Sequence, residues 1–197
     1  MLDTTIFIVI AYLIGSISSA IVVCKILRLP DPRTQGSGNP GATNVLRIGG
    51  KGPAMVTLLG DILKGVIPVL AAKWYGLSTL AISAVAFAAF LGHIFPIYFR
   101  FQGGKGVATA FGCLVTLAWP AGLTLAGTWL LVALITRYSS LAALIATLLA
   151  PIDIWVFTQQ WDYTLMTVFI SLILIYRHKS NIQKLMRGEE TKIGQKK

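Results

Sequence analysis

The sequence has few charged residues, few carboxylates and few cysteines. Charged residues make up 12% of the 197-residue chain, about half the share of roughly 25% that is usual in soluble domains. Hydrophobic residues make up 55%, and the mean hydropathy is +0.75. A soluble protein of this size lacks the interior to bury so much apolar surface, which nearly excludes a soluble globular fold. A polytopic membrane protein is therefore the first interpretation.

The scarce residue types also exclude several chemistries. Cys24 and Cys113 lie in apolar runs, which excludes a disulfide framework or a thiolate metal cluster and predicts two small buried side chains. The carboxylates near the polar loops, Asp31, Glu189 and Glu190, lack the spacing of metal ligands, so we expect no metal and no cofactor. The 17 basic and 7 acidic residues give a net charge of +10. In a membrane protein this excess indicates orientation and anionic lipid rather than nucleic acid.

Seven apolar runs approach the length of about 20 residues that a helix needs to cross the hydrocarbon core. The predicted spans are 4–24, 53–72, 79–99, 106–120, 122–136, 141–158 and 163–176. A six-span alternative fuses the fourth and fifth runs into one kinked helix of about 31 residues, which would need strong tilt. The first run is not a secretory signal, because it opens with Asp3 and has neither a basic leading region nor a cleavage site after it.

Lysine and arginine predict the orientation, because cytoplasmic loops are rich in both. With seven spans, fifteen of these residues lie on one side: Lys25, Arg28, Arg33, Arg47, Lys51, Arg100, Lys105, Arg137, Arg177, Lys179, Lys184, Arg187, Lys192, Lys196 and Lys197. The opposite side holds Lys73, while Lys64 falls within a span. We therefore expect an all-α integral membrane protein with its N-terminus outside and its C-terminus in the cytoplasm. The six-span alternative would place Arg137 beside Lys73 and separate the tail from the earlier loops.

The first of three polar strings on the predicted cytoplasmic side is residues 36–44, Gly-Ser-Gly-Asn-Pro-Gly-Ala-Thr-Asn. Its glycines match a dinucleotide fingerprint, but no strand precedes them, and Asp61, about twenty residues on, falls within a span. The glycines instead let backbone N–H groups converge on an anion. Neutral donors and one arginine that can grip a phosphate accompany them: Ser37, Asn39, Thr43, Asn44 and Arg47. The alternative is a flexible cytoplasmic hairpin.

The second string, residues 102–109, is a glycine-rich turn that opens the fourth predicted span. A glycine-rich turn with a lysine at a helix N-terminus is suited to bind an anion. It is not a Walker A loop, because no serine or threonine follows Gly104-Lys105 and the earlier glycine is missing. The alternative is a positive-inside lysine on a tight turn.

The third string, residues 177–181, is followed by Glu189 and Glu190. Within it, His178 can serve as an acid or base near neutral pH, and the alternative is a basic flank that anchors the last span. Ile182, Leu185 and Met186 have the spacing of an interfacial helix, which Gly188 would stop.

Three further polar residues fall in or at the end of predicted spans. Asp61 and Lys64 are three positions apart, so they share a helix face and can pair. Charges inside a span usually mark function, although a structural pair is an equal alternative here. His93 ends the third span, where a hydrogen-bonded packing histidine is the simpler interpretation.

These positions favour an enzyme that acts on amphiphilic substrates at one membrane face. Two anion-binding loops suggest two phosphate-bearing ligands, one with an acyl tail between helices. The sequence has no G-x-S-x-G elbow and no cysteine in a polar setting, so a covalent enzyme intermediate is not expected. One rival is a phosphate or organic-anion transporter, although transport would favour polar groups at the midplane and internal repeats. The other is a non-catalytic scaffold that binds anionic lipid.

The strings occur in one order along the chain: 36–44, Gly-Asp61-x-x-Lys64-Gly, Gly92-His93-x-Phe95-Pro96, Gly-Gly-Lys105-Gly-Val-Ala-Thr109, and Arg177-His178-x-x-Asn181-Ile with Gly188-x-Glu190. This order resembles the bacterial acyl-phosphate:glycerol-3-phosphate acyltransferase family, PlsY, over essentially the whole chain. The resemblance implies a single transmembrane acyltransferase domain over residues 1–197, in the bacterial inner membrane with its active site at the cytoplasmic face. It implies transfer of a fatty acyl group from acyl phosphate to the 1-position of glycerol 3-phosphate in phospholipid synthesis, giving lysophosphatidate and phosphate.

The resemblance also suggests roles for individual residues. We expect acyl phosphate to bind at Gly103, Gly104, Lys105, Gly106 and Thr109. We expect glycerol 3-phosphate to bind at Ser37, Asn39, Thr43, Asn44, Arg47, Lys105, His178 and Asn181. Ser37, Lys105, His178 and Asn181 are the expected catalytic residues, and Asp61, Lys64, His93 and Glu190 the supporting ones.

The His-x-x-x-x-Asp pair of soluble-type acyltransferases is absent, since Tyr98 and Gln183 stand five positions after the two histidines. We therefore expect direct attack by the glycerol hydroxyl on the activated acyl phosphate. The proton acceptor is either His178 or the departing phosphate.

Overall fold

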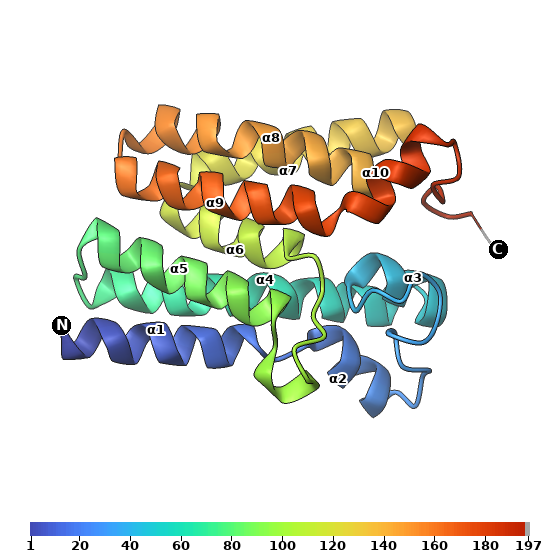
Figure 1. Cartoon of the computed structure of the whole chain (residues 1–197), viewed down its shortest axis with the longest axis horizontal. Helices are drawn as coiled ribbons and strands as arrows, with labels where there is room; N and C mark the ends of the chain where they lie inside the picture. Colours follow the sequence, from blue (N-terminus) through green and yellow to red (C-terminus); the bar gives the residue numbers. More distant parts are fainter. Residues whose placement is uncertain (196–197) are drawn as a thin grey trace. The chain divides into compact units, whose positions relative to one another are not determined.

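The computed structural model describes residues 1–195, so Lys196 and Lys197, which the orientation argument counts, lie outside the described residues. Over the described range the secondary structure is helical, without a β-strand (Figure 1). The elements are α1 (Leu2–Gly15), α2 (Ser19–Ile26), α3 (Ala42–Gly49), α4 (Lys51–Trp74), α5 (Thr79–Ile94), the 3-10 helix η1 (Ile97–Phe99), α6 (Val107–Leu117), α7 (Trp119–Thr136), α8 (Ser139–Thr158), α9 (Trp161–Arg177) and α10 (Lys179–Met186). The chain divides into two compact units, Met1–Cys113 and Leu114–Lys197.

Several helices are long and apolar enough to cross a membrane, as the hydropathy predicts. By length and composition four helical segments can cross a membrane: α4, Thr79–Phe99, α7 and α8. The pair α1 and α2 makes a fifth if it is counted as one span. Helix α6 has 11 residues and is about 16 Å long, short of a hydrocarbon core of about 30 Å. Four or five crossings are thus supported by helix length, and seven crossings stay a prediction.

The first predicted span is not one helix. α1 ends at Gly15, α2 begins at Ser19, and the two are bent by 43°. The break frees backbone groups that apolar surroundings cannot satisfy. The carbonyl of Ile17 within the break accepts a hydrogen bond of 2.8 Å from Lys64 Nζ of α4. The expectation of a continuous helix over 4–24 was therefore wrong, because a side chain far along the sequence satisfies the interruption.

Glycines set the packing of the first unit. A Cβ at Gly15 of α1 would overlap the carbonyl oxygen of Ala89 in α5, and one at Gly92 of α5 would overlap that of Tyr12 in α1. Small residues of this kind let two helix backbones approach closely in a membrane. Tyr12 Oη also donates to the Phe95 carbonyl oxygen at 2.7 Å, which fixes α1 to the end of α5.

A small apolar cluster packs α3 against α2 and α4. Ala20 and Cys24 of α2 pack with Val45 of α3 and Ala54 of α4. Cys24 is 1% exposed, and Cys113 is fully buried with its Sγ 3.6 Å from the carbonyl oxygen of Ala86. The prediction that both cysteines are buried thiols is confirmed.

The second unit contains α7 to α10. Helix α7 begins at Trp119, three residues before the predicted start, and has Pro120 in its first turn, where proline is favoured. Asp153 does not interrupt α8, because Thr124 Oγ1 of α7 donates to its Oδ2 at 3.0 Å. Helix α10 ends at Met186 before Gly188, whose φ of +70° suits glycine at a helix end. The predicted tail helix and its stop are confirmed.

Candidate active site

The first polar loop is folded around one buried side chain, Asn44. It is 2% exposed, and its Oδ1 accepts a hydrogen bond of 2.8 Å from the Ser37 amide. Its Nδ2 donates to the carbonyl oxygens of Pro32 at 2.8 Å and Gln35 at 3.0 Å. The sequence predicts that Asn44 binds glycerol 3-phosphate, and in the structure its amide hydrogen-bonds to the loop backbone. These contacts give Asn44 a role in shaping the loop.

The glycines of this loop are required for its shape. Gly36 and Gly38 have φ values of +62° and +71°, in the left-handed region that favours glycine. A Cβ at Gly36 would also overlap Asn44 Oδ1. The loop is therefore a defined turn and not the flexible hairpin that the sequence left open.

The other polar side chains of the first string lie nearer the surface. Ser37 and Arg47 are exposed, and Asn39 and Thr43 are half-buried. Arg47 lies in the last turn of α3, which begins at Ala42. An exposed serine and an exposed arginine on one short loop-helix segment are accessible to a soluble anion.

An ion pair that the sequence analysis did not single out fixes the start of the loop. Arg33 Nη2 lies 2.6 Å from Asp31 Oδ2, and Arg33 Nε donates to Asp31 Oδ1 at 3.0 Å. The hydrogen bonds from the guanidinium hold the pKa of Asp31 below its ordinary value. The Asp31 carboxylate thus stabilises the start of the loop, and the Arg33 guanidinium is already paired with it.

The second polar loop is packed against the end of α5. Gly103, Gly104 and Gly106 are all buried. A Cβ at Gly103 would overlap the carbonyl oxygen of His93, and one at Gly106, whose φ is +94°, would overlap the ring of Phe90. All of these positions need glycine for steric reasons.

Gly104 differs from what the sequence predicts. We expected its amide to face acyl phosphate, but that N–H donates to the carbonyl oxygen of His93 at 3.2 Å. A Cβ at Gly104 would overlap His93 Nε2 and lie 3.1 Å from the carbonyl oxygen of Pro40. Gly104 thus lies where the second loop meets both His93 and the first loop.

The two other members of the second string differ in burial. Lys105 is half-buried and immediately precedes the last glycine before α6. Thr109 is fully buried, and its carbonyl oxygen would be overlapped by a Cβ at Gly65 of α4. The backbone of Thr109 therefore belongs to the packing between α4 and α6, and its expected contact with acyl phosphate stays a prediction.

Three ionisable side chains meet inside the first unit. Lys64 Nζ lies 3.0 Å from Asp61 Oδ1, and His93 Nδ1 lies 3.7 Å from the same oxygen. The predicted pairing of Asp61 with Lys64 is confirmed. The sequence assigned His93 no link to either residue, because it lies on another helix.

The third polar string, residues 177–181, lies in the second unit. His178 is 3% exposed and precedes the first turn of α10. Its Nδ1 lies 2.8 Å from the carbonyl oxygen of Leu174. Because a carbonyl can only accept, Nδ1 is the donor in this contact, and whenever the ring is neutral Nε2 is its basic nitrogen.

Asn181 is oriented by a carboxylate of the tail. Its Nδ2 donates to Glu190 Oε1 at 2.9 Å, and Ser140 Oγ of α8 donates to the same oxygen at 2.8 Å. The supporting role expected of Glu190 thus has a geometric basis. Ser140 was missed, because a serine at a helix start carries no signal of such a contact.

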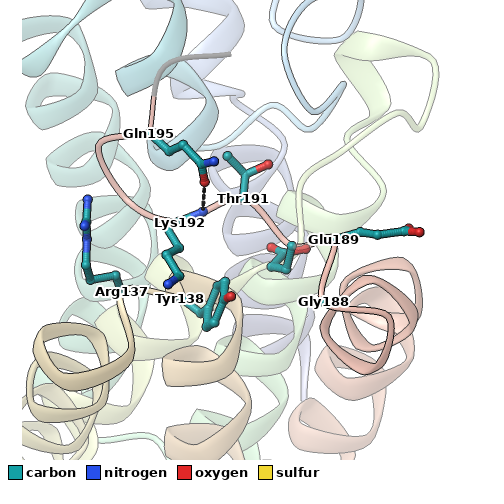
Figure 2. Close-up of a pocket in the computed structure, with 8 residues that line it drawn as sticks. Arg137, Tyr138, Gly188, Glu189, Thr191, Lys192 and Gln195 are labelled. Atoms are coloured by element: carbon teal, nitrogen blue, oxygen red, sulfur yellow. Dashed lines mark hydrogen bonds between the residues drawn. The ribbon is translucent and has the colours of Figure 1, made fainter.

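The tail beyond α10 folds back on the start of α8 and lines an open pocket of about 550 Å³ (Figure 2). The Ile193 amide donates to the Arg137 carbonyl oxygen at 2.7 Å, and Arg137 Nη2 donates to the Ile193 carbonyl oxygen at 3.0 Å. The lining comprises Arg137, Tyr138, Gly188, Glu189, Glu190, Thr191, Lys192 and Gln195. Within residues 1–195, no group of three or more histidine, cysteine or acidic side chains could hold a metal ion.

These features define a class of protein: an all-helical integral membrane protein with two glycine-rich, anion-suited loops in one unit and a buried histidine in the other. The chain belongs to the glycerol-3-phosphate acyltransferase family, whose model matches residues 5–188. The resemblance inferred from the polar strings is therefore confirmed.

Named relatives and solved structures agree. The glycerol-3-phosphate acyltransferase of Methylococcus capsulatus is 53% identical over 187 residues, which cover 95% of this chain and 94% of that protein. The enzyme of Thioalkalivibrio sulfidiphilus is 55% identical, with 94% and 92% covered. The crystal structure of PlsY, an integral membrane glycerol 3-phosphate acyltransferase, in its glycerol 3-phosphate form is 38% identical with a TM-score of 0.93, covering 98% of this chain and 96% of that one. Its lysophosphatidic acid form gives a TM-score of 0.90.

Proposed function

We propose that this member of the glycerol-3-phosphate acyltransferase family takes its acyl group from an acyl phosphate. The acyl group passes to the 1-position of glycerol 3-phosphate and gives lysophosphatidate and inorganic phosphate, a step of phospholipid synthesis. The observation that carries this proposal is the meeting of two glycine-rich loops at Gly104 and Pro40. Two substrates that each bear a phosphate require two such loops close together.

The residues divide between the two substrates according to their exposure. Arg47 and Ser37, exposed on the first loop and α3, bind the phosphate of glycerol 3-phosphate, with Asn39 and Thr43 as further donors. Lys105, with the backbone of Gly103 and Gly106, holds acyl phosphate and also contacts glycerol 3-phosphate. His178 and Asn181 act on glycerol 3-phosphate, and Glu190 orients the Asn181 amide.

The chemistry is a direct transfer. The 1-hydroxyl oxygen of glycerol 3-phosphate attacks the acyl carbonyl carbon, the carbonyl–phosphate bond breaks, and phosphate leaves with the bonding electrons. The hydroxyl proton goes to His178 Nε2 or to the departing phosphate. The hydrogen bond from His178 Nδ1 to the Leu174 carbonyl supports the first route, because it presents Nε2 as the acceptor.

We further propose the topology of the chain. The seven apolar segments cross the bacterial inner membrane, with the N-terminus outside, the tail in the cytoplasm, and the two units forming one acyltransferase domain. The basic residues support this orientation, since all but Lys73 and the intramembrane Lys64 fall in segments assigned to the cytoplasmic face. The polar strings then lie at the face where a soluble substrate would enter.

The test of the proposed function uses the purified protein in detergent with acyl phosphate and labelled glycerol 3-phosphate. Labelled lysophosphatidate and one equivalent of phosphate are the expected products. Counterflow of phosphate in sealed vesicles, without any lipid product, would instead identify a transporter. Salt-sensitive lipid binding that survives Lys105→Ala, without turnover, would identify a scaffold.

A further inference from the structure

The buried charge cluster of the first unit spans two structural elements that the proposed function does not connect. Asp61, Lys64 and His93 are 2%, 5% and 6% exposed. Asp61 Oδ1 is the shared partner, 3.0 Å from Lys64 Nζ and 3.7 Å from His93 Nδ1. Well-packed apolar side chains often stabilise a fold as well as a buried ion pair does, so stability alone does not explain this cluster. Ionisable groups within a membrane bundle are functional candidates by default.

One end of the cluster lies on the break in the first span. Lys64 Nζ donates to the carbonyl oxygen of Ile17 at 2.8 Å, between α1 and α2. A Cβ at Gly60, one turn before Lys64 on α4, would come 2.7 Å from Ser19 Oγ at the start of α2. Helix α4 is therefore in close contact with the break, and Lys64 supplies a donor that the interrupted helix lacks.

The other end of the cluster lies under the glycine loop. The His93 carbonyl oxygen accepts from the Gly104 amide at 3.2 Å. The His93 ring stands against Gly104, since a Cβ there would overlap Nε2 and lie 2.9 Å from Cε1. His93 thus holds Gly104 through its backbone carbonyl and packs on it through the ring whose Nδ1 lies 3.7 Å from Asp61 Oδ1.

We propose that Asp61, Lys64 and His93 are positioning residues that fix the glycine loop, residues 102–106, in the geometry that binds acyl phosphate. Lys64 anchors the cluster to the broken helix, and Asp61 faces both Lys64 and the His93 ring. His93 in turn fixes the position of Gly104. This inference rests on the proposed function, because it takes the loop to be the acyl-phosphate site. None of the three residues touches a substrate.

The test separates positioning from stability by a double variant. Asp61→Asn and Lys64→Met each leave one buried charge without its partner, so both single variants lower the thermal midpoint. Asp61→Asn/Lys64→Met removes both charges and restores much of that midpoint. Lys73→Met is the matched control, because Lys73 is an exposed lysine in the last turn of the same helix.

Kinetics of the double variant decide the proposal. We expect its KM for acyl phosphate to rise about tenfold or more, since displacements of about 1 Å at a site can cost up to 100-fold. Its KM for glycerol 3-phosphate rises less, because Lys105 is the one residue of the glycine loop that also contacts that substrate, and the kinetics of Lys73→Met stay unchanged. If the acyl-phosphate KM returns to the parent value together with the thermal midpoint, the cluster only stabilises the fold and the proposal is overturned.

A readout without turnover keeps the outcome separate from the proposed function. A spin label on Gln102→Cys, in a Cys24→Ala/Cys113→Ala background, reports the mobility of the glycine loop, because Gln102 is exposed. The double variant should raise that mobility, and Lys73→Met should not. An unchanged spectrum in the double variant overturns the proposal. If the parent protein does not use acyl phosphate but the spectrum responds, then the proposed function fails while the network is upheld.

Discussion

The substitution Gly104→Ala, which adds one methyl group, should lower activity strongly while the protein still folds and purifies. A Cβ at this position overlaps His93 Nε2 and lies 2.9 Å from His93 Cε1, against an ordinary contact of at least 3.4 Å. The ring must therefore retreat by more than about 0.5 Å, because Nε2 overlaps more closely than Cε1, and the Pro40 carbonyl at 3.1 Å must give by about 0.3 Å. The His93 ring is 6% exposed with Asp61 3.7 Å away, so its retreat disturbs the charge cluster.

The size of the effect follows from these displacements. Overpacking a buried site costs about 1–3 kcal/mol, which a membrane bundle can tolerate. A shift of several tenths of an ångström in a substrate loop should lower kcat/KM by about ten- to 100-fold. Gly104→Ala should thus purify normally and fail in the acyl-phosphate assay, measured as lysophosphatidate formed per minute.

Gly127→Ala is the matched control for this substitution. Gly127 lies inside α7, and a Cβ there meets no heavy atom within 4 Å. The exchange should raise helix stability slightly, by up to about 1 kcal/mol, and leave turnover unchanged. Full activity in Gly104→Ala would refute the reasoning, because it would show that the loop tolerates displacement where it meets His93 and Pro40.

Three further predictions concern the first loop and the chemistry. Arg47→Ala should raise the KM for glycerol 3-phosphate about 30-fold, the equivalent of about 2 kcal/mol for an accessible guanidinium–phosphate pair. Arg47→Lys should recover little of this loss, because lysine lacks the planar guanidinium. An unchanged KM in Arg47→Ala would show that Arg47 contributes only to the orientation of the chain in the membrane. Asn44→Ala leaves the buried Pro32 carbonyl without a donor at about 1–3 kcal/mol and removes the partly buried bond to the Gln35 carbonyl as well. The thermal midpoint should therefore fall clearly, whereas a raised KM with an unchanged midpoint would identify Asn44 as a ligand-binding residue. Cys24→Ala/Cys113→Ala should stay active with sequential kinetics, and a burst of phosphate from acyl phosphate alone, with the acyl group kept on the protein, would contradict direct transfer.

Hydropathy predicted where helices lie but not where they are interrupted. The run over 4–24 is apolar on average, and its average hydropathy hides the glycine and serines at 15–19, where the 43° bend between α1 and α2 falls. The interruption is satisfied by Lys64, 47 positions after Ile17. A contact of that sequence separation depends on the packing of α4 and cannot be derived from the local pattern. The pairing of Asp61 with Lys64 was predictable, because helical spacing alone brings the two together.

The polar strings predict which segments form the site, but they do not predict the environment of each side chain. Ser37, Thr43 and Asn44 look alike in the sequence as neutral donors on a glycine-rich loop. The fold buries Asn44 at 2% exposure and directs its amide to Pro32 and Gln35, while Ser37 stays exposed. Burial within a loop depends on how the chain turns, and here the left-handed glycine at Gly36 makes room for the Asn44 side chain.

The structure also changes the reason why the second loop needs glycine. The sequence suggested that glycine amides face a phosphate, yet the Gly104 amide is bonded to His93, and a Cβ at Gly103 or Gly104 would overlap that residue. A phosphate-binding loop can bind the anion through backbone amides that point at it. Alternatively, tight packing of the loop backbone can fix the position of a neighbouring lysine that binds the anion. The contacts of Gly103, Gly104 and Gly106 favour the second arrangement, with Lys105 as the presented charge. The glycines of this loop then serve the enzyme mainly through what they touch inside the protein, so conservative changes in the packing beneath the loop should matter as much as changes at its surface.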